Sequence, residues 1–310
     1  MITGMLNFTA MLFLFTLIIG AAIWEFTGLV NERDGITVNR FICSAAGMFL
    51  NLAMAGFCSG LTPAIVFVPY LITIIYIFVS ELYLKQEDPI HDWAYAMMSQ
   101  LYIALPFACI NILAFTTGEF YWLMPLSVFI FLWCNDSGAY LVGSLIGRHK
   151  LFPRVSPGKS WEGSIGGGIV VLAVAALLGS IEPTTAEGIG RSGMSIIEWM
   201  GLGLVVVVFG TWGDLVESLF KRTLGIKDSG NILPGHGGML DRFDSALLAI
   251  PAATIYLYSL EAFYRSEGAF HALPIAGYNY RIQRPGAITT TQLPDLRDLF
   301  ADIEESIKRH

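Results

Sequence analysis

The sequence is poor in charged residues. Only 14% of its 310 residues are Asp, Glu, Lys or Arg, whereas soluble globular proteins carry about 25%. Hydrophobic residues make up 55% of the chain, and so few charges do not suffice to cover a water-soluble surface. The composition therefore excludes an ordinary cytosolic enzyme and indicates an integral membrane protein.

Cysteine is scarce as well, and the chain has no short glycine repeat. Cys43, Cys58, Cys109 and Cys134 stand in or beside apolar runs without metal-type pairing, so we interpret them as small hydrophobic side chains. These absences exclude collagen-like, disordered and disulfide-scaffold proteins. No Lys or Arg precedes Arg33, so the first apolar run lacks the basic start of a signal peptide and is predicted to be an uncleaved span.

Long apolar runs are abundant. A helix that crosses a bilayer needs about 20 predominantly apolar residues, and eight runs approach or exceed this length. They predict an all-α, polytopic integral membrane protein with eight or nine transmembrane helices and a polar site facing the cytoplasm. The predicted spans are about 8–30, 41–57, 63–84, 93–115, 120–141, 164–181, 196–217 and 245–260.

Positive charges are distributed unevenly between the predicted loops. If the spans alternate in direction, eleven Lys and Arg residues lie on one side and Arg191 alone on the other. Cytoplasmic loops carry such an excess, so the side with eleven basic residues is predicted to be cytoplasmic. The remaining six stand in the segment 261–310, whose polar composition indicates an extramembrane tail.

Acidic residues inside spans mark functional sites by default. We nevertheless interpret the isolated Glu25, Glu81 and Glu119, which stand near predicted span ends, as snorkelling or locally hydrogen-bonded side chains. The informative acids are those grouped in two polar stretches further along the chain.

The first polar stretch covers residues 133–168. Asp136 is expected at or just below the cytoplasmic membrane surface, and because an unpaired carboxylate is costly there, we expect a cation beside it. Basic residues, serines and glycines follow, and they suit a polyphosphate, whose oxygens are held by amides and cations together. A loop that only sets topology, or one that binds anionic head groups, is an equal alternative. The basic residues and serines are Arg148, Lys150, Arg154, Ser156, Lys159 and Ser160.

The second polar stretch, residues 213–245, contains two acidic pairs. Asp214 and Glu217 end one predicted helix, and Asp241 and Asp244 repeat their spacing at the start of the next, which places each pair on one helix face. Four carboxylates at one membrane surface repel one another unless cations neutralise them, and Mg²⁺ prefers such oxygen ligands. We therefore predict a Mg²⁺ site, with room for a second cation, formed by Asp136, Asp214, Asp241 and Asp244.

Basic and glycine-rich residues separate the two acidic pairs. Lys221, Arg222 and Lys227 come first, and the turn 234–238 then precedes a helix and offers backbone N–H groups to phosphate oxygens. Within this turn we favour a phosphate or metal-shell role for His236 over a purely turn-stabilising one. Carboxylates beside a basic, glycine-rich turn indicate metal-assisted phosphoryl or nucleotidyl transfer.

The segment from Ser218 to Asp244 resembles the signature of the phosphatidate cytidylyltransferase family, also called CDP-diacylglycerol synthases, and matches it at every fixed position. The segment Asp136–Tyr140 is similar to the family's Asp-Thr-Gly-Ala-Tyr element, and 156–163 is similar to its Ser-Pro-Lys-Thr-Trp-Glu-Gly element. In both, Ser replaces Thr and keeps the hydroxyl group. These matches cover roughly residues 134–245.

The resemblance implies that the protein transfers the cytidylyl group of CTP to phosphatidate, giving CDP-diacylglycerol and pyrophosphate for phospholipid synthesis. We predict that the acids hold Mg²⁺, that the basic residues bind the phosphates, and that the 235–238 backbone supports the pyrophosphate. The predicted catalytic residues are Asp214, Lys227, His236, Asp241 and Asp244. The predicted substrate-binding residues are Arg148, Ser156, Lys159, Ser160, Lys221, Arg222, Gly237, Gly238 and Arg242.

The resemblance also implies a bacterial inner or plasma membrane protein whose partners are CTP, phosphatidate and the lipid bilayer. No nucleic-acid partner is expected, and a homodimer is allowed. We divide the chain into N-terminal helices over 1–119 that form a lipid groove, a catalytic region over 120–264 that contains the signature 218–244, and a polar tail over 265–310. Whether Trp161 and Glu162 bind cytosine or pack the loop stays open.

Three alternatives stay open beside this interpretation. A CTP-dependent polyprenol or phytol kinase would need a positioned base to deprotonate an alcohol. A synthase of ether-lipid CDP derivatives would use the same chemistry on another lipid. An ion-coupled transporter, a different class, predicts ionisable groups near mid-bilayer and repeated halves, whereas the charged motifs here cluster at one predicted membrane face.

Overall fold

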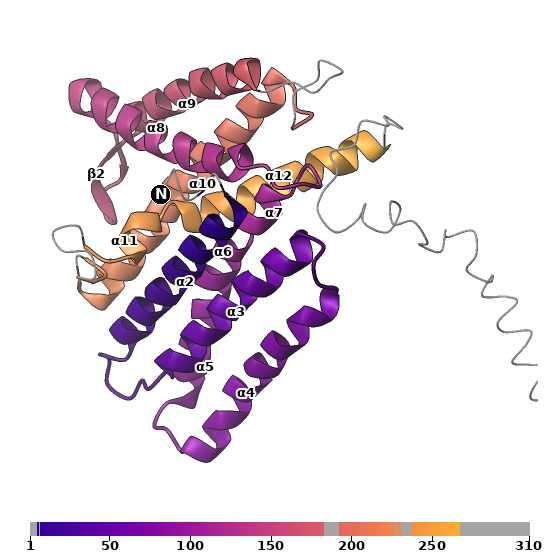
Figure 1. Ribbon diagram of the computed structural model, residues 1–310. Helices are drawn as coiled ribbons and strands as arrows, with labels where there is room; N and C mark the ends of the chain where they lie inside the picture. Colours follow the sequence, from indigo (N-terminus) through magenta and orange to yellow (C-terminus); the bar gives the residue numbers. More distant parts are fainter. Residues whose placement is uncertain (1–4, 6, 183–191, 227, 231–236, 267–310) are drawn as a thin grey trace, which may run out of the picture.

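The computed structural model describes residues 5, 7–182, 192–226, 228–230 and 237–266. Within these ranges eight helical segments are long and apolar enough to cross a membrane, which confirms the predicted polytopic helical protein (Figure 1). Most of the predicted tail 265–310 lies outside the described residues. The segments are α2 (Phe8–Val30), α3 (Arg40–Cys58), η1 with α4 (Ala64–Phe67 and Val68–Leu84), α5 to α7 (Pro89–Ala114), α8 (Leu123–Ile146), α9 (Trp161–Ile181), α10 (Ile196–Leu224), and α11 with α12 (Leu240–Phe243 and Ala246–Ser266).

Helix α10 is defined at both ends by local sequence signals. The Ser195 hydroxyl accepts a hydrogen bond from the Glu198 N–H (3.4 Å), and the Glu198 carboxylate accepts one from the Ser195 N–H (2.6 Å). This reciprocal capping box satisfies two free helix donors. At the other end, Gly225 adopts a positive φ of 72°, a conformation that glycine adopts without strain and that stops a helix.

Helices α8 and α10 extend past their predicted ends. Helix α8 continues to Ile146 and α10 to Leu224, beyond the predicted ends at about 141 and 217. Asp136 therefore lies about 15 Å before the end of α8, at 1.5 Å per residue. The helix thus carries Asp136 at an interior position, as the predicted span 120–141 implied.

Glycines hold α8 and α9 in close contact. A Cβ atom at Gly138 would lie 3.0 Å from the Gly167 Cα atom, and one at Gly167 would lie 2.6 Å from the Asn135 carbonyl oxygen. Small residues allow membrane helices to approach each other at this distance. Gly138 and Gly167 therefore serve helix packing.

The span made of α5 (Pro89–Met98), η2 (Ser99–Ala104), α6 (Leu105–Ala108) and α7 (Ile110–Ala114) is irregular. Its middle turn, η2, is π-helical, and Pro106 follows two residues after its end. Proline lacks an N–H group and clashes with the carbonyl of the preceding turn, so the backbone widens there. The Gln100 side chain joins this turn to α3, because its Nε2 atom donates to the Cys43 carbonyl (3.0 Å).

A short hairpin follows α8, and within the described ranges it is the one departure from an all-helical fold. Strand β1 (Lys150–Phe152) pairs antiparallel with β2 (Ser156–Ser160). Ser160 ends β2 and caps α9, because its hydroxyl accepts a hydrogen bond from the Gly163 N–H (3.2 Å). The hairpin thereby fixes Lys159 beside the start of α9.

The basic connections gather at one end of the helical assembly. The β1–β2 hairpin, the α2–α3 connection, the α4–α5 connection and the end of α10 all lie toward the same side (Figure 1). Helix α10 packs against both α9 and α12, and α11 contacts α2. This packing brings the two polar stretches of the sequence together.

Candidate functional site

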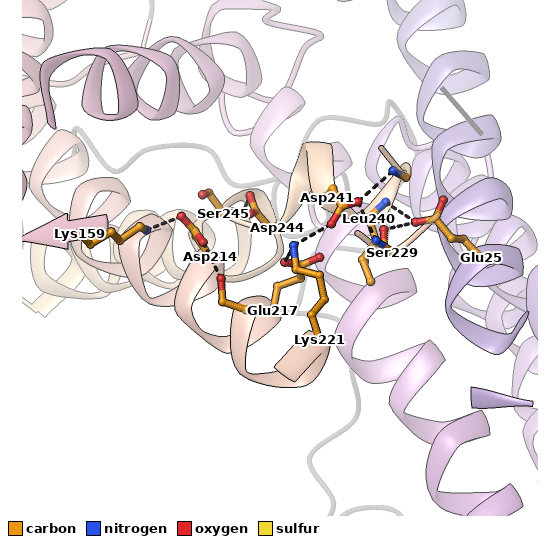
Figure 2. A network of polar contacts seen from close by, with 12 residues as sticks. Glu25, Lys159, Asp214, Glu217, Lys221, Ser229, Leu240, Asp241, Asp244 and Ser245 are labelled. Carbon is orange, nitrogen blue, oxygen red and sulfur yellow. Dashed lines mark hydrogen bonds and ion pairs between the residues drawn. The ribbon is translucent and has the colours of Figure 1, made fainter. Parts of the chain in front are cut away.

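Charged side chains from several elements meet along α10 (Figure 2). Asp214, Glu217 and Lys221 follow one another at helical spacings of three and four residues, so they line one side of α10. Their partners come from β2, from α8 and from the segment around α11. The contacts form two groups, one around Asp214 and one around Lys221.

The first group joins Asp214 to a lysine and two further carboxylates. The Lys159 ammonium forms an ion pair with the Asp214 carboxylate, and both side chains are about 25% exposed. Asp136 interacts electrostatically with Asp214 and Lys159, and Asp244 interacts with Asp214 and Asp136. We call Asp136, Asp214 and Asp244 the acidic group. Three carboxyl groups thus lie around one ammonium group, that of Lys159.

A cavity of about 490 Å³ opens beside the acidic group. It lies between α8, β2, α9 and α10, and Asp136, Lys159 and Asp214 contribute to its wall. Its volume falls in the range of small-molecule sites. Hydroxyl groups supply further polar lining from Tyr140, Ser144, Ser160, Ser164 and Thr211.

The second group is built around Lys221. Its ammonium lies between the Glu217 carboxylate (2.6 Å) and the Asp241 Oδ1 atom (2.7 Å). The Asp241 Oδ2 atom accepts hydrogen bonds from the backbone N–H groups of Ser229 (2.8 Å) and Gly238 (2.9 Å). Both oxygens of Asp241 are therefore bonded to protein donors, and Glu217 is fully buried.

Other predicted site residues lie apart from these two groups. Arg148 lines a separate, shallow hollow together with Trp161 and Glu162. Glu162 accepts from His149 Nδ1 (2.5 Å) and from two backbone N–H groups, so it packs the hairpin onto α9. Ser156 is in β2, and Arg222 and Arg242 are exposed at the end of α10 and on α11. Lys227 and His236 lie outside the described residues.

Two predicted phosphate-binding glycines have clear structural roles in the described part of the turn. Gly237 has a positive φ of 78°, which disfavours other residues, and a Cβ atom there would lie 2.9 Å from the Asp241 Oδ2 atom. The Gly238 N–H donates to that same oxygen. Gly237 thus allows the backbone to lie close to the Asp241 carboxylate, and Gly238 donates a hydrogen bond to it.

Glu25 is the functional candidate that the sequence interpretation missed. It is 6% exposed on α2, and its carboxylate accepts hydrogen bonds from the Ser229 hydroxyl, the Met239 N–H (2.8 Å) and the Leu240 N–H (3.1 Å). The interpretation as a snorkelling or locally bonded side chain is wrong, because these donors lie more than 200 residues away in the chain. The signal was present, since an acid inside an apolar span marks a site by default.

The acidic group has the ligand type of a divalent-cation site but not its arrangement. Carboxylate oxygens are the ligands that Mg²⁺ prefers, and the three carboxyl groups outnumber the Lys159 ammonium that pairs with one of them. Among the described residues, no three His, Cys, Asp or Glu side chains are arranged to hold a metal ion together. The Lys159 ammonium is paired with Asp214, and both residues line the cavity.

Fold and site together define a polytopic membrane protein with a charged site enclosed by its spans. A family model described as the cytidylyltransferase family matches residues 1–260. The chain therefore belongs to the cytidylyltransferase family.

Curated relatives carry one common name. The chain is 39% identical to the phosphatidate cytidylyltransferase of Staphylococcus aureus over 173 residues, which are 56% of this chain and 62% of the relative. It is 44% identical to the phosphatidate cytidylyltransferase of Haemophilus influenzae over 133 residues, 43% of this chain and 45% of the relative. The chain thus spans less than two thirds of the length of each of these relatives.

Proposed function

We propose that this protein transfers the cytidylyl group of CTP to phosphatidate, forming CDP-diacylglycerol and releasing pyrophosphate. The observation that carries the proposal is the acidic group with Lys159, which opens on a cavity between membrane-spanning helices of a cytidylyltransferase-family chain. The relatives named phosphatidate cytidylyltransferase support the choice of lipid substrate.

The attacking group in this reaction needs no strong base. It is the phosphate monoester of phosphatidate, whose second pKa of about 6 leaves it largely dianionic near neutral pH. One of its oxygens forms a bond to the α-phosphorus of CTP, and the bond from that phosphorus to the pyrophosphate oxygen breaks. The main barrier is the approach of two polyanions, so cationic groups matter more than a base.

Within this proposal the acidic group, Asp136, Asp214 and Asp244, holds Mg²⁺. When bound there, the ion neutralises triphosphate charge and stabilises the leaving pyrophosphate. Lys159 contacts the phosphates from the cavity wall. Asp241 is left out of this metal set, unlike in the sequence-based prediction, because three donors hold its two oxygens and two of them are backbone N–H groups. The oxygens of Asp214 meet the side chains of Lys159 and Ser218 instead, which a cation or a phosphate can displace.

The cavity also suggests how the lipid reaches the site. Its walls are membrane-spanning helices, and apolar side chains such as Leu141, Ile165 and Ile169 are exposed on α8 and α9. Phosphatidate would keep its acyl chains against these faces while its head group enters the cavity. We place the site at the cytoplasmic face, because the basic connections gather at that end and CTP is supplied there.

Two labels on CTP test the proposal against its alternatives. Purified protein in detergent receives Mg²⁺, phosphatidate and CTP labelled at either the α- or the γ-phosphorus. Cytidylyl transfer carries the α-label into the organic phase and the γ-label into pyrophosphate, and EDTA abolishes both. A γ-label that enters a polyprenol or phytol would support a lipid kinase, and no lipid labelling with any acceptor would refute an enzyme of this type.

A further inference from the structure

Glu25 anchors the signature segment from the other end of the chain. The side chain projects from α2 toward Ser229, Met239 and Leu240, which flank the glycine-rich turn (Figure 2). Because Glu25 is buried and its carboxylate accepts three hydrogen bonds, these are charge-assisted bonds of the stronger kind. Helix α2 contacts α11 at this point.

The signature glycines leave the space that this carboxylate fills. A Cβ atom at Gly230 would lie 2.8 Å from the Glu25 Oε2 atom, and one at Gly238 would overlap the Oε1 atom. Alanine at either position would displace the carboxylate or the turn. The Glu25 carboxylate therefore accounts for glycine at both positions, because it fills the space that a side chain would need.

Ser229 connects Glu25 to the charged groups on α10. Its hydroxyl donates to Glu25, and its N–H donates to Asp241 (2.8 Å). Asp241 in turn holds Lys221, which also pairs with Glu217 on α10. A continuous set of polar contacts therefore runs from α2 to the helix that carries Asp214.

We propose that Glu25 is a positioning residue for cytidylyl transfer. It fixes Ser229, Met239 and Leu240, which lie just before and at the start of α11. Through Ser229 it holds Asp241, and Asp241 positions Lys221. The same contacts set where Asp244 lies relative to Asp214. This inference rests on the proposed function. Helix α2 would thus contribute to turnover although Glu25 does not contact the substrate.

The variant Glu25→Gln tests the proposal, because glutamine keeps the shape but loses the charge and one acceptor oxygen. We expect kcat to fall about 100-fold, as for reacting groups displaced by about 1 Å, while KM for CTP changes little. Glu25→Asp, which keeps the charge, should restore part of kcat. Glu32→Gln, an exposed acid just after α2, is the matched control and should behave as wild type.

Amide hydrogen exchange gives a readout that does not depend on the reaction. In Glu25→Gln the amides of residues 238–240 should exchange faster, while those of α9 stay unchanged. Ser229→Ala should give a milder version of both effects, and it serves as the second variant if Glu25→Gln does not fold. The role of Glu25 would be overturned if these variants had the wild-type kcat per folded molecule. It would also be overturned if the amides of residues 238–240 exchanged at the wild-type rate. A wild-type protein that does not label lipid, with exchange altered as expected, would instead refute the proposed function alone.

Discussion

Replacing Asp241 and Asp244 separately by asparagine distinguishes their roles. Asp241 accepts backbone hydrogen bonds from Ser229 and Gly238, whereas Asp244 belongs to the acidic group. The Asp241 Oδ1 atom pairs with Lys221 at 2.7 Å, and its Oδ2 atom accepts two N–H groups at 2.8 and 2.9 Å. Asparagine has only one acceptor oxygen, so its NH₂ group must face either the ammonium or the two amides. With each charged hydrogen bond contributing about 1.5–3 kcal/mol and Lys221 still paired with Glu217, we expect Asp241→Asn to lower the free energy of unfolding by about 2–4 kcal/mol.

Asp244→Asn should give the opposite pattern. Asp244 interacts unfavourably with Asp214 and Asp136, so removing its charge relieves repulsion and leaves stability unchanged or higher. Turnover should fall at least about 100-fold, equivalent to about 3 kcal/mol of transition-state stabilisation lost with the cation site.

Both variants are measured for thermal unfolding in detergent and for lipid labelling from CTP per mole of folded protein, with Mg²⁺ varied. The expected result is an unstable, partly active Asp241→Asn and a stable, inactive Asp244→Asn. If Asp241→Asn unfolds like wild type and is inactive, Asp241 belongs to the metal site. If Asp244→Asn is active at ordinary Mg²⁺, Asp244 does not.

Three further predictions follow from other contacts. Lys159→Met should reduce turnover about 100-fold, because it removes the cation beside Asp214; Lys159→Arg should retain part of it, and equal activity of the two variants would refute a charge role. Gly167→Ala should lower the free energy of unfolding by about 1–3 kcal/mol through overpacking, whereas Gly168→Ala, whose Cβ atom would meet its nearest neighbour at 3.7 Å, should be neutral; equal melting temperatures would contradict the close α8–α9 packing. Cysteine introduced at Arg154 in the hairpin should react with an impermeant thiol reagent only in inside-out vesicles, and at Leu61 only in intact cells; the reverse pattern would invert the orientation.

The spans could be predicted from the sequence because their cause is local. A segment in lipid must satisfy its own backbone hydrogen bonds, so a long apolar run becomes a helix whatever its neighbours are. Run length therefore located all eight helical segments. The ends of α8 and α10 were placed too early, at about 141 and 217 instead of Ile146 and Leu224, because both helices continue beyond the apolar runs that were used to place them.

The acidic and basic residues of the site could also be identified along the chain, but their pairing could not. Helical spacing placed Asp214 and Glu217 on one face, as it does for Asp241 and Asp244, and suggested one shared metal site. In the folded chain the two pairs divide differently. Asp214 and Asp244 approach Asp136, whereas Glu217 and Asp241 enclose Lys221.

Helix packing decided this division, because it sets which side chains from distant segments meet. The contact between α2 and α11 brings Glu25 to Ser229 across about two thirds of the chain, and no local pattern near Glu25 encodes that partner. Residue types and helical periods are written in short stretches of sequence. Which carboxylates lie near one another and which enclose Lys221 depends on long-range packing, and only the tertiary structure decided it.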